Sequence, residues 1–203
     1  KAGYHDRNLY QNIASATKLR EMNRNNENIN DFIPYKLEDI NCDIPYDISN
    51  LDSAIISKLR LMTAEDLQNI SEVTEGIENR ILSSANMSYS FETLVENVKN
   101  KRYTTSKIRR MIISALIDFT KNIYSPMPQY IRILGMNKVG MTILKQAKDI
   151  CKVPIITKTA DFKEQSPQFN LDVRATNIAM LCNPIPTHRI GNADLKKSPI
   201  IMK

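Results

Sequence analysis

The segment that decides the fold is TTSKIRRMIISALIDF, residues 104–119. Its apolar side chains recur at intervals of one, three or four residues: Ile108, Met111, Ile112, Ala115, Leu116 and Phe119. Such spacing places them along one face of an α-helix, and Thr104 or Thr105 can cap the start of that helix. We therefore expect a helix with one apolar stripe, which needs other helices to pack against.

Four more short helices are predicted ahead of this segment. They are expected over residues 51–62, from Thr63 onward, over residues 72–83 and from Ser90 onward. Thr63 and Asp66 approximate a capping box at the start of the second. In the third, Val73, Ile77 and Ile81 stand four residues apart, as they would on one face of a helix. Five short helices in series predict a helical bundle.

The pattern changes after two prolines at positions 126 and 128. The predicted elements are then a strand at 130–134, a turn at Gly135, a helix at 138–150, a strand at 153–157 and a helix at 172–181. Two strands joined by a helix predict a parallel βαβ unit with a right-handed crossover. From Asn183 onward, proline and glycine predict a loop.

The residues ahead of the bundle predict one helix and a linker. Residues 9–22 lead into a helix that Ser15 or Thr17 can cap, and residues 23–50 are rich in asparagine with no sustained period. The predicted fold class is therefore α+β, mainly α. Its predicted parts are an N-terminal tail at 1–22, a linker at 23–50, a helical domain at 51–125 and a C-terminal α/β portion at 126–203.

Composition excludes several classes of protein. With 203 residues, 42% of them hydrophobic and 25% charged, the chain is neither collagen-like nor disordered, and no run of about 18 apolar residues predicts a membrane span. Cys42, Cys151 and Cys182 are odd in number and widely spaced, which excludes a disulfide scaffold or zinc site. The start at Lys1 has neither a signal pattern nor an initiator Met. We expect a cytoplasmic protein and a fragment whose beginning lies upstream.

Charge is divided unevenly along the chain. Residues 1–98 hold 9 basic and 16 acidic residues, a net charge of −7, and residues 99–203 hold 19 and 6, a net charge of +13. This asymmetry favours a polyanion as partner of the second half, although a basic surface that serves only solubility explains it equally well. Acidic lipid is a weaker interpretation, because no basic amphipathic helix with bulky aromatic residues is present.

The first candidate site is IASATKLR, residues 13–20. Hydroxyl residues ahead of a helix leave backbone N–H groups at its positive end, and a lysine and an arginine follow within the first turns. Ser15, Thr17, Lys18 and Arg20 therefore suit a phosphate group. The alternative is a plain N-cap with solvated basic side chains.

The second candidate site is VKNKRYTTSKIRR, residues 98–110, where basic residues straddle a helix start. The candidates are Lys99, Lys101, Arg102, Lys107, Arg109 and Arg110. Those on the helix lie away from its apolar stripe, and cations at a helix N-terminus are unfavourable unless an anion neutralises them. The segment thus predicts contacts to a phosphate backbone, with a solvated charged face as the alternative.

Other candidates are weaker. Paired carboxylates among Glu72, Glu75 and Glu78 could do acid–base chemistry, but a structural network bridged by Arg80 accounts for them better. The glycines at 135 and 140 are too close for a phosphate-binding loop, and His188 supports no catalytic triad.

Four blocks of sequence together resemble the bacterial tRNA(Met) cytidine acetate ligase family, in the nucleotidyltransferase superfamily. In order, they are Gly3–Asp6 (GYHD), Ile13–Arg20, Glu72–Ile81 (EVTEGIENRI) and Lys101–Thr104 (KRYT). Further matches follow at Tyr130–Gly135, Pro154–Thr157, Arg174–Thr176 and Ser198–Ile200. The resemblance spans nearly the whole chain, and its most specific blocks are Glu-x-Glu-Gly and Lys-Arg-Tyr-Thr.

The resemblance implies an enzyme that uses ATP, with magnesium, to activate acetate as acetyl-adenylate and then acetylates the wobble cytidine of elongator methionine tRNA. It implies that residues 1–22 end a Rossmann-like nucleotidyltransferase domain, with Ser15, Thr17, Lys18 and Arg20 at the ATP phosphates. The family's His-x-Gly-His signature is missing from this sequence. We expect the catalytic residues upstream of Lys1 and this chain alone to be inactive, contributing mainly tRNA binding.

Two alternatives belong to other classes of function. One is a non-enzymatic helical interaction module whose basic half docks an acidic protein surface. The other is a different nucleotidyltransferase, of the pantetheine- or nicotinamide-nucleotide type, although the long helical and βαβ extension has no obvious role there.

Overall fold

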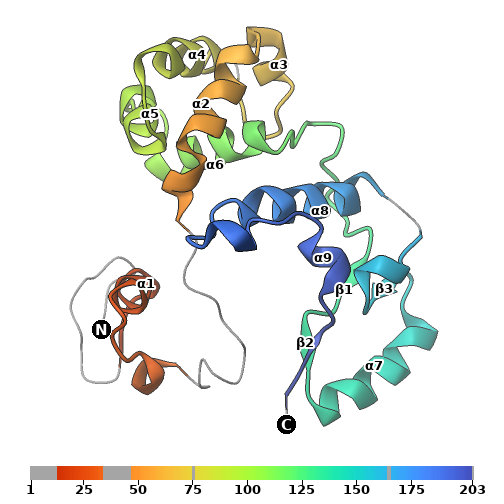
Figure 1. Cartoon of the computed structure of the whole chain (residues 1–203). Helices are drawn as coiled ribbons and strands as arrows, with labels where there is room; N and C mark the ends of the chain where they lie inside the picture. Colours follow the sequence, from red (N-terminus) through yellow and green to blue (C-terminus); the bar gives the residue numbers. More distant parts are fainter. Residues whose placement is uncertain (1–12, 34–46, 75, 164–165, 203) are drawn as a thin grey trace.

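The structure is a computed structural model that describes residues 13–33, 47–74, 76–163 and 166–202. Figure 1 shows three parts: an N-terminal helix, a bundle of short helices, and a C-terminal α/β portion. The predicted fold class, α+β and mainly α, is confirmed. The Gly3–Asp6 block, Cys42 and Glu75 lie outside the described residues, as does most of the predicted linker.

The bundle consists of the five helices that the sequence predicts. They are α2 (Asp52–Leu61), α3 (Ala64–Gln68), α4 (Glu78–Met87), α5 (Phe91–Val98) and α6 (Thr105–Leu116), with the short 3₁₀ helix η3 (Ile48–Leu51) leading in. Thr63 forms the predicted capping box with Asp66, and Ser90 and Thr104 are the N-caps of α5 and α6. Local hydrogen bonding therefore sets where these helices begin.

The predicted apolar stripes meet in one core. Its members include Ile55, Leu59, Ile81, Leu94 and Ile108, all at most 1% exposed. Helix α2 packs against both α4 and α6, so it is the centre of the bundle. Burial on this scale supplies most of the free energy that holds such short helices in place.

Two predicted features of the bundle are wrong in detail. The helix expected over residues 72–83 begins only at Glu78, because Gly76 adopts a left-handed conformation with φ +89° and ends any regular helix there. Helix α6 ends at Leu116, and Asp118 (φ 54°) turns the chain, so that Phe119 leaves the helical stripe. The backbone carbonyl of Phe119 then accepts a hydrogen bond from the N–H of Ser71 at 2.8 Å.

The C-terminal portion contains two small parallel sheets. Strand β1 (Ile131–Arg132) pairs with β3 (Ile155–Ile156), and helix α7 (Lys138–Ile150) lies between them in sequence. The predicted parallel βαβ pairing is thus confirmed. Strand β2 (Gly135–Met136) pairs in parallel with β4 (Ile200–Ile201), so Gly135 belongs to a strand and not to the predicted turn.

The remaining elements correct the predicted C-terminal boundaries. Helix α8 (Pro167–Met180) begins five residues earlier than predicted, capped by Ser166 with a proline in its first turn. The predicted loop after Asn183 contains η5 (Pro186–His188), α9 (Ala193–Lys196) and β4. A further 3₁₀ helix, η4 (Thr159–Asp161), packs against α9. These short elements have no period that a sequence pattern could reveal.

The end of α8 joins the C-terminal portion to the bundle. Cys182 is buried in the bundle's core, and its carbonyl accepts hydrogen bonds from the N–H of Asp47 at 2.9 Å and the amide of Asn50 at 3.3 Å. Arg174 donates to the carbonyl of Ile117 at 3.0 Å. Both Cys182 and Cys151 are free thiols, and burial raises the pKa of the Cys182 thiol.

The N-terminal helix stands apart from the bundle in Figure 1. Helix α1 (Ala16–Arg24) starts at the predicted cap Ser15, and η1 (Asn30–Phe32) follows it. The buried apolar residues here are Met22 on α1 and Ile29, which directly precedes η1. Among the residues that the structure describes, no helix has the length and apolar character of a membrane span.

Candidate nucleic-acid interface

The basic segment forms a turn that Arg80 holds in place. The Arg80 guanidinium donates to three successive carbonyls at the end of α5: Asn97 at 3.0 Å, Val98 at 2.8 Å and Lys99 at 2.9 Å. These groups are unpaired at any helix C-terminus, and a guanidinium fork satisfies several of them together. Arg80 therefore fixes the point at which the chain leaves α5 for the basic turn.

Asn100 and Tyr103 organise the turn itself. The Asn100 side-chain oxygen accepts hydrogen bonds from the N–H groups of Arg102 at 2.9 Å and Tyr103 at 3.0 Å. Tyr103 is buried, and its hydroxyl lies 2.6 Å from that of Thr74. The turn between α5 and α6 is thus tied to the loop ahead of α4.

Two cations gather over the Tyr103 ring. The Arg102 guanidinium carbon lies 5.3 Å from the ring centroid and the Lys107 ammonium nitrogen 5.1 Å from it. Each such contact is worth about 0.5–1 kcal/mol at an exposed site. Tyr103 thus orders one cation from the turn and one from the first turn of α6 around a single ring.

The six predicted cations divide into two groups. Arg109 pairs with Glu92, and Arg110 lies 3.5 Å from the carboxylate of Glu72. Lys99, Lys101, Arg102 and Lys107 form no ion pair with any carboxylate in the described part of the chain. The three cations on the helix, Lys107, Arg109 and Arg110, stay off its buried face, as predicted. Of these, Arg109 and Arg110 are paired with carboxylates of the protein.

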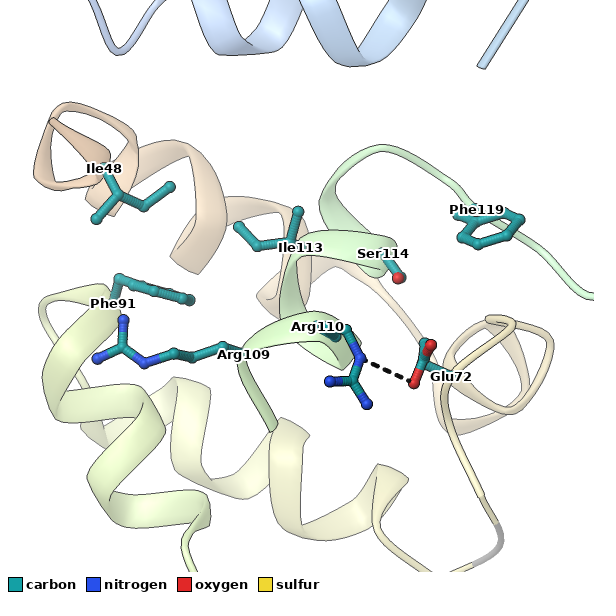
Figure 2. Close-up of a pocket in the computed structure, with 8 residues that line it drawn as sticks. All are labelled: Ile48, Glu72, Phe91, Arg109, Arg110, Ile113, Ser114 and Phe119. Atoms are coloured by element: carbon teal, nitrogen blue, oxygen red, sulfur yellow. Dashed lines mark ion pairs between the residues drawn. The ribbon is translucent and has the colours of Figure 1, made fainter. Parts of the chain in front are cut away.

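Two neighbouring pockets adjoin this surface and share Glu72. The larger, of about 440 Å³, lies along the outer side of α6 and is lined by Ile48, Glu72, Phe91, Arg109, Arg110, Ile113, Ser114 and Phe119 (Figure 2). The smaller, of about 350 Å³, is lined by Ser71, Glu72, Thr74, Lys107, Lys121 and Tyr124. Their volumes suit small organic groups.

Sequence reasoning missed Lys121, Tyr124 and Phe91 as members of this surface. Lys121 and Tyr124 follow the turn at Asp118, and the Lys121 N–H donates to the carbonyl of Asn69 at 2.8 Å. That link carries both side chains beside Lys107. No local pattern marks them, since a lone lysine and tyrosine in a loop have no spacing to interpret.

The two glutamates of this group that the structure describes, Glu72 and Glu78, do not form the predicted network with Arg80. Arg80 contacts carbonyls, Glu72 pairs with Arg110, and Glu78 accepts a hydrogen bond from the Gln68 amide at 3.0 Å. That bond and nearby backbone N–H groups hold the pKa of Glu78 below its usual range despite burial. Glu78 thus remains a carboxylate that supports the start of α4.

The four predicted phosphate-site residues lie together at the start of α1. The Ser15 hydroxyl accepts a hydrogen bond from the N–H of Lys18 at 3.1 Å, and the Arg20 guanidinium donates to the Thr17 hydroxyl at 3.5 Å. The Lys18 ammonium lies 3.7 Å from Glu21. Ser15 therefore caps α1 as predicted, and the basic residues Lys18 and Arg20 lie in the first turns of the same helix.

Arg132 and Asp194 form a bidentate ion pair in the C-terminal portion. Arg132 on β1 binds both carboxylate oxygens of Asp194 on α9, at 2.7 and 3.0 Å. Burial alone would raise the pKa of Asp194, but hydrogen bonds from Arg132 and Thr176 and the charge of Arg132 hold it below its usual range. Tyr130 donates to Asp172, and burial followed by that carboxylate raises the pKa of the phenol. His188 lies in η5, and the described residues offer no cluster of metal ligands.

A comparison with known families identifies the family of the chain. The family model described as HIGH Nucleotidyl Transferase matches residues 1–194. The chain therefore belongs to the HIGH nucleotidyltransferase family, as the sequence resemblance predicts.

Comparison with individual proteins is more specific than the family model. The chain is 33% identical to the tRNA(Met) cytidine acetate ligase of Thermosipho africanus, covering 100% of this chain and 54% of that protein, and 31% identical to that of Clostridium botulinum, covering 100% and 51%. This chain thus spans about half the length of these relatives.

Two solved structures of a related protein also match the fold of this chain. Apo TmcAL from Thermotoga maritima matches with a TM-score of 0.84 at 27% identity, over 99% of this chain and 53% of that one. The same protein bound to alpha-thio ATP matches with a TM-score of 0.80 at 28% identity, over 96% and 53%.

Proposed function

We propose that this chain is the tRNA-binding part of a cytoplasmic, ATP-dependent tRNA(Met) cytidine acetate ligase. The complete enzyme activates acetate as acetyl-adenylate and transfers the acetyl group to the wobble cytidine of elongator methionine tRNA. The ligase names of the curated relatives support the reaction. The tRNA-binding role rests on the basic turn.

One observation carries this role: the fold collects cations that no carboxylate of the described segments neutralises. Lys101, Arg102 and Lys107 project from a turn that Arg80 and Tyr103 fix, and the described carboxylates leave them unpaired. A phosphate backbone supplies the missing negative charge. Lys99 lies beside them, and Arg109 and Arg110 meet the RNA next to their own carboxylates.

Salt dependence tests the proposal. Binding of elongator methionine tRNA, measured by filter retention or anisotropy, should weaken steeply with salt, and Lys101→Ala should lower the slope of log K against log salt by about 0.7–0.9. Lys148→Ala, an exposed lysine on α7, is the matched control and should leave the slope unchanged. A flat salt response of the parent chain contradicts the proposal.

Competition separates tRNA from an acidic protein partner. A glutamate-rich peptide of equal charge should displace tRNA only at much higher concentration, because it lacks the spacing of phosphates along a folded RNA. Equal displacement by peptide and by tRNA would favour the interaction module instead.

We further propose that Ser15, Thr17, Lys18 and Arg20 contribute to the ATP phosphate site. The first N–H groups of α1 and two basic side chains suit a phosphate, and ATP brings magnesium with it. ATP affinity measured by calorimetry should fall in Lys18→Ala and Arg20→Ala but not in Lys148→Ala. Loss of affinity in none of them removes the assignment.

The chain alone should not make acetyl-adenylate. Incubation with ATP, magnesium and acetate should release no pyrophosphate, since the printed sequence lacks the His-x-Gly-His signature and spans about half the length of the related ligases. Pyrophosphate release by this chain would contradict that expectation.

A further inference from the structure

The two pockets that share Glu72 differ in chemistry. The larger is lined by apolar side chains such as Ile113 and Phe119 together with two arginines, whereas the smaller presents Lys107 and Lys121. An unstacked nucleotide has the same division, with an apolar, flat base and a charged phosphate. The larger pocket thus suits a base, and the smaller pocket suits a phosphate.

Arg109 supplies a flat, oriented surface at the larger pocket. Its guanidinium carbon lies 5.2 Å from the Phe91 ring centroid, and Glu92 pairs with it. Figure 2 shows the guanidinium beside Phe91 at one end of the pocket, with Phe119 at the other. The contacts with Phe91 and Glu92 thus fix the plane of the Arg109 guanidinium, which would otherwise be mobile. Bases stack on guanidinium planes as they do on aromatic rings.

Glu72 stands where the two pockets meet. Its side chain is 33% exposed, and its one ion pair within the described ranges, to Arg110, is long at 3.5 Å. A carboxylate has about four acceptor positions, so several remain for the N–H donors on the edge of a base. The nucleobases cytosine, adenine and guanine carry such donors on their exocyclic amines.

We infer that the larger pocket binds one unstacked base of the RNA, with the phosphates of the nucleotides next to it at Lys107 and Lys121. The base stacks on Arg109 beside Phe91, and Glu72, beyond Arg110, accepts from an amine of the neighbouring base (Figure 2). Tyr124, an exposed aromatic in the smaller pocket, provides a surface for the neighbouring base. This inference rests on the proposed tRNA-binding role and adds to it a base-binding subsite that charge alone would not require.

A tryptophan reporter tests the location. The sequence contains no tryptophan, so Phe119→Trp introduces a single fluorophore into the pocket wall at the cost of a conservative change. Saturating elongator methionine tRNA should quench its emission by about half or more. Tyr89→Trp, at a residue 82% exposed between α4 and α5, is the control and should stay unquenched.

Arg109→Lys tests the stacking. This variant keeps the positive charge but loses the plane, so the affinity for tRNA should fall about tenfold, as for the loss of one stacked base, whereas the affinity for inorganic polyphosphate should not change. Arg24→Lys, in the last turn of α1, is the matched control and should change neither affinity. Thermal melts of each variant check that it is folded.

The outcomes separate this inference from the proposed function. Binding of tRNA without quenching in Phe119→Trp, or equal losses for tRNA and polyphosphate in Arg109→Lys, overturns the base-binding subsite and leaves the basic turn in place. Absence of tRNA binding by the parent chain overturns both.

Discussion

The helical bundle and the C-terminal α/β portion bury their apolar residues to very different degrees. In the bundle, the stripes of five helices converge on a core whose central side chains are almost completely buried. Helix α7 of the C-terminal portion is equally amphipathic in sequence but has no buried residue, and Val139 and Ile143 on it are exposed. An apolar stripe predicts a helix in both regions, but only a neighbouring stripe turns it into a core.

The largest effect should separate the two regions directly. Leu94→Ala removes a side chain that is 0% exposed and should lower the free energy of unfolding by about 2–5 kcal/mol. Ile143→Ala, at a residue 60% exposed on α7, should cost less than about 1 kcal/mol. Urea denaturation followed by circular dichroism measures both. Similar losses in the two variants would show that the contrast in burial does not govern stability.

The second prediction concerns the Arg132–Asp194 ion pair, which we expect to stabilise the C-terminal portion in the place of a large apolar core. Asp194→Ala leaves the Arg132 guanidinium partly buried without its partner and should cost about 2–3 kcal/mol. The pKa of Asp194 is lowered in the folded state, so its stabilising contribution is present above the unfolded pKa of about 4 and is lost as pH falls through the lower folded value.

The pH dependence of the stability tests whether the charge of Asp194 is responsible for this effect. The difference in melting temperature between the parent chain and Asp194→Asn should be constant from pH 7 to about pH 5 and shrink below about pH 4. A difference that grows as the pH falls would contradict a lowered pKa of Asp194 in the folded state.

A smaller effect should come from the cap that begins α6. Thr104→Ala removes the hydroxyl that accepts from the N–H of Lys107 at 3.3 Å and should destabilise the bundle by about 1 kcal/mol. Thr104→Ser keeps an acceptor and should restore most of the stability. Denaturant midpoints measure the difference, and equal values for the two variants would remove the cap as a contributor.

The smallest effect should come from the surface ion pair of Arg109. Glu92→Gln removes the charge opposite Arg109, and because both side chains are substantially exposed, the free energy of unfolding should change by no more than about 0.5 kcal/mol. A larger loss in the same urea titration would mean that ion pairs, and not only the core, hold the bundle together.

Prediction from sequence succeeded where the signal was local. The caps at Ser15, Thr63 and Ser90 and the helix at 138–150 are present as expected, because each depends on a few neighbouring residues. The helix predicted from residue 72 failed at Gly76, since the apolar spacing of Val73, Ile77 and Ile81 continues through a turn that is not helical. These three residues are buried all the same, so the pattern predicted burial better than it predicted conformation.

For the candidate site, the sequence located the charges but not their partners. Lys101 and Arg109 look alike as members of one basic run, yet Arg109 meets Glu92 from α5 and Lys101 meets no described carboxylate. Pairing depends on which helices pack together, and a linear pattern contains no distance between residues far apart in the chain. Lys121 and Phe91 were missed for the same reason.

The sequence by itself determined the helical stripes, the caps, the uneven charge and the family resemblance, because each is a property of neighbouring residues or of their order. The tertiary structure alone decided which cations are neutralised, where the two pockets meet at Glu72, and which apolar stripe becomes a core. These depend on contacts between helices, and their strength falls off within a few ångströms.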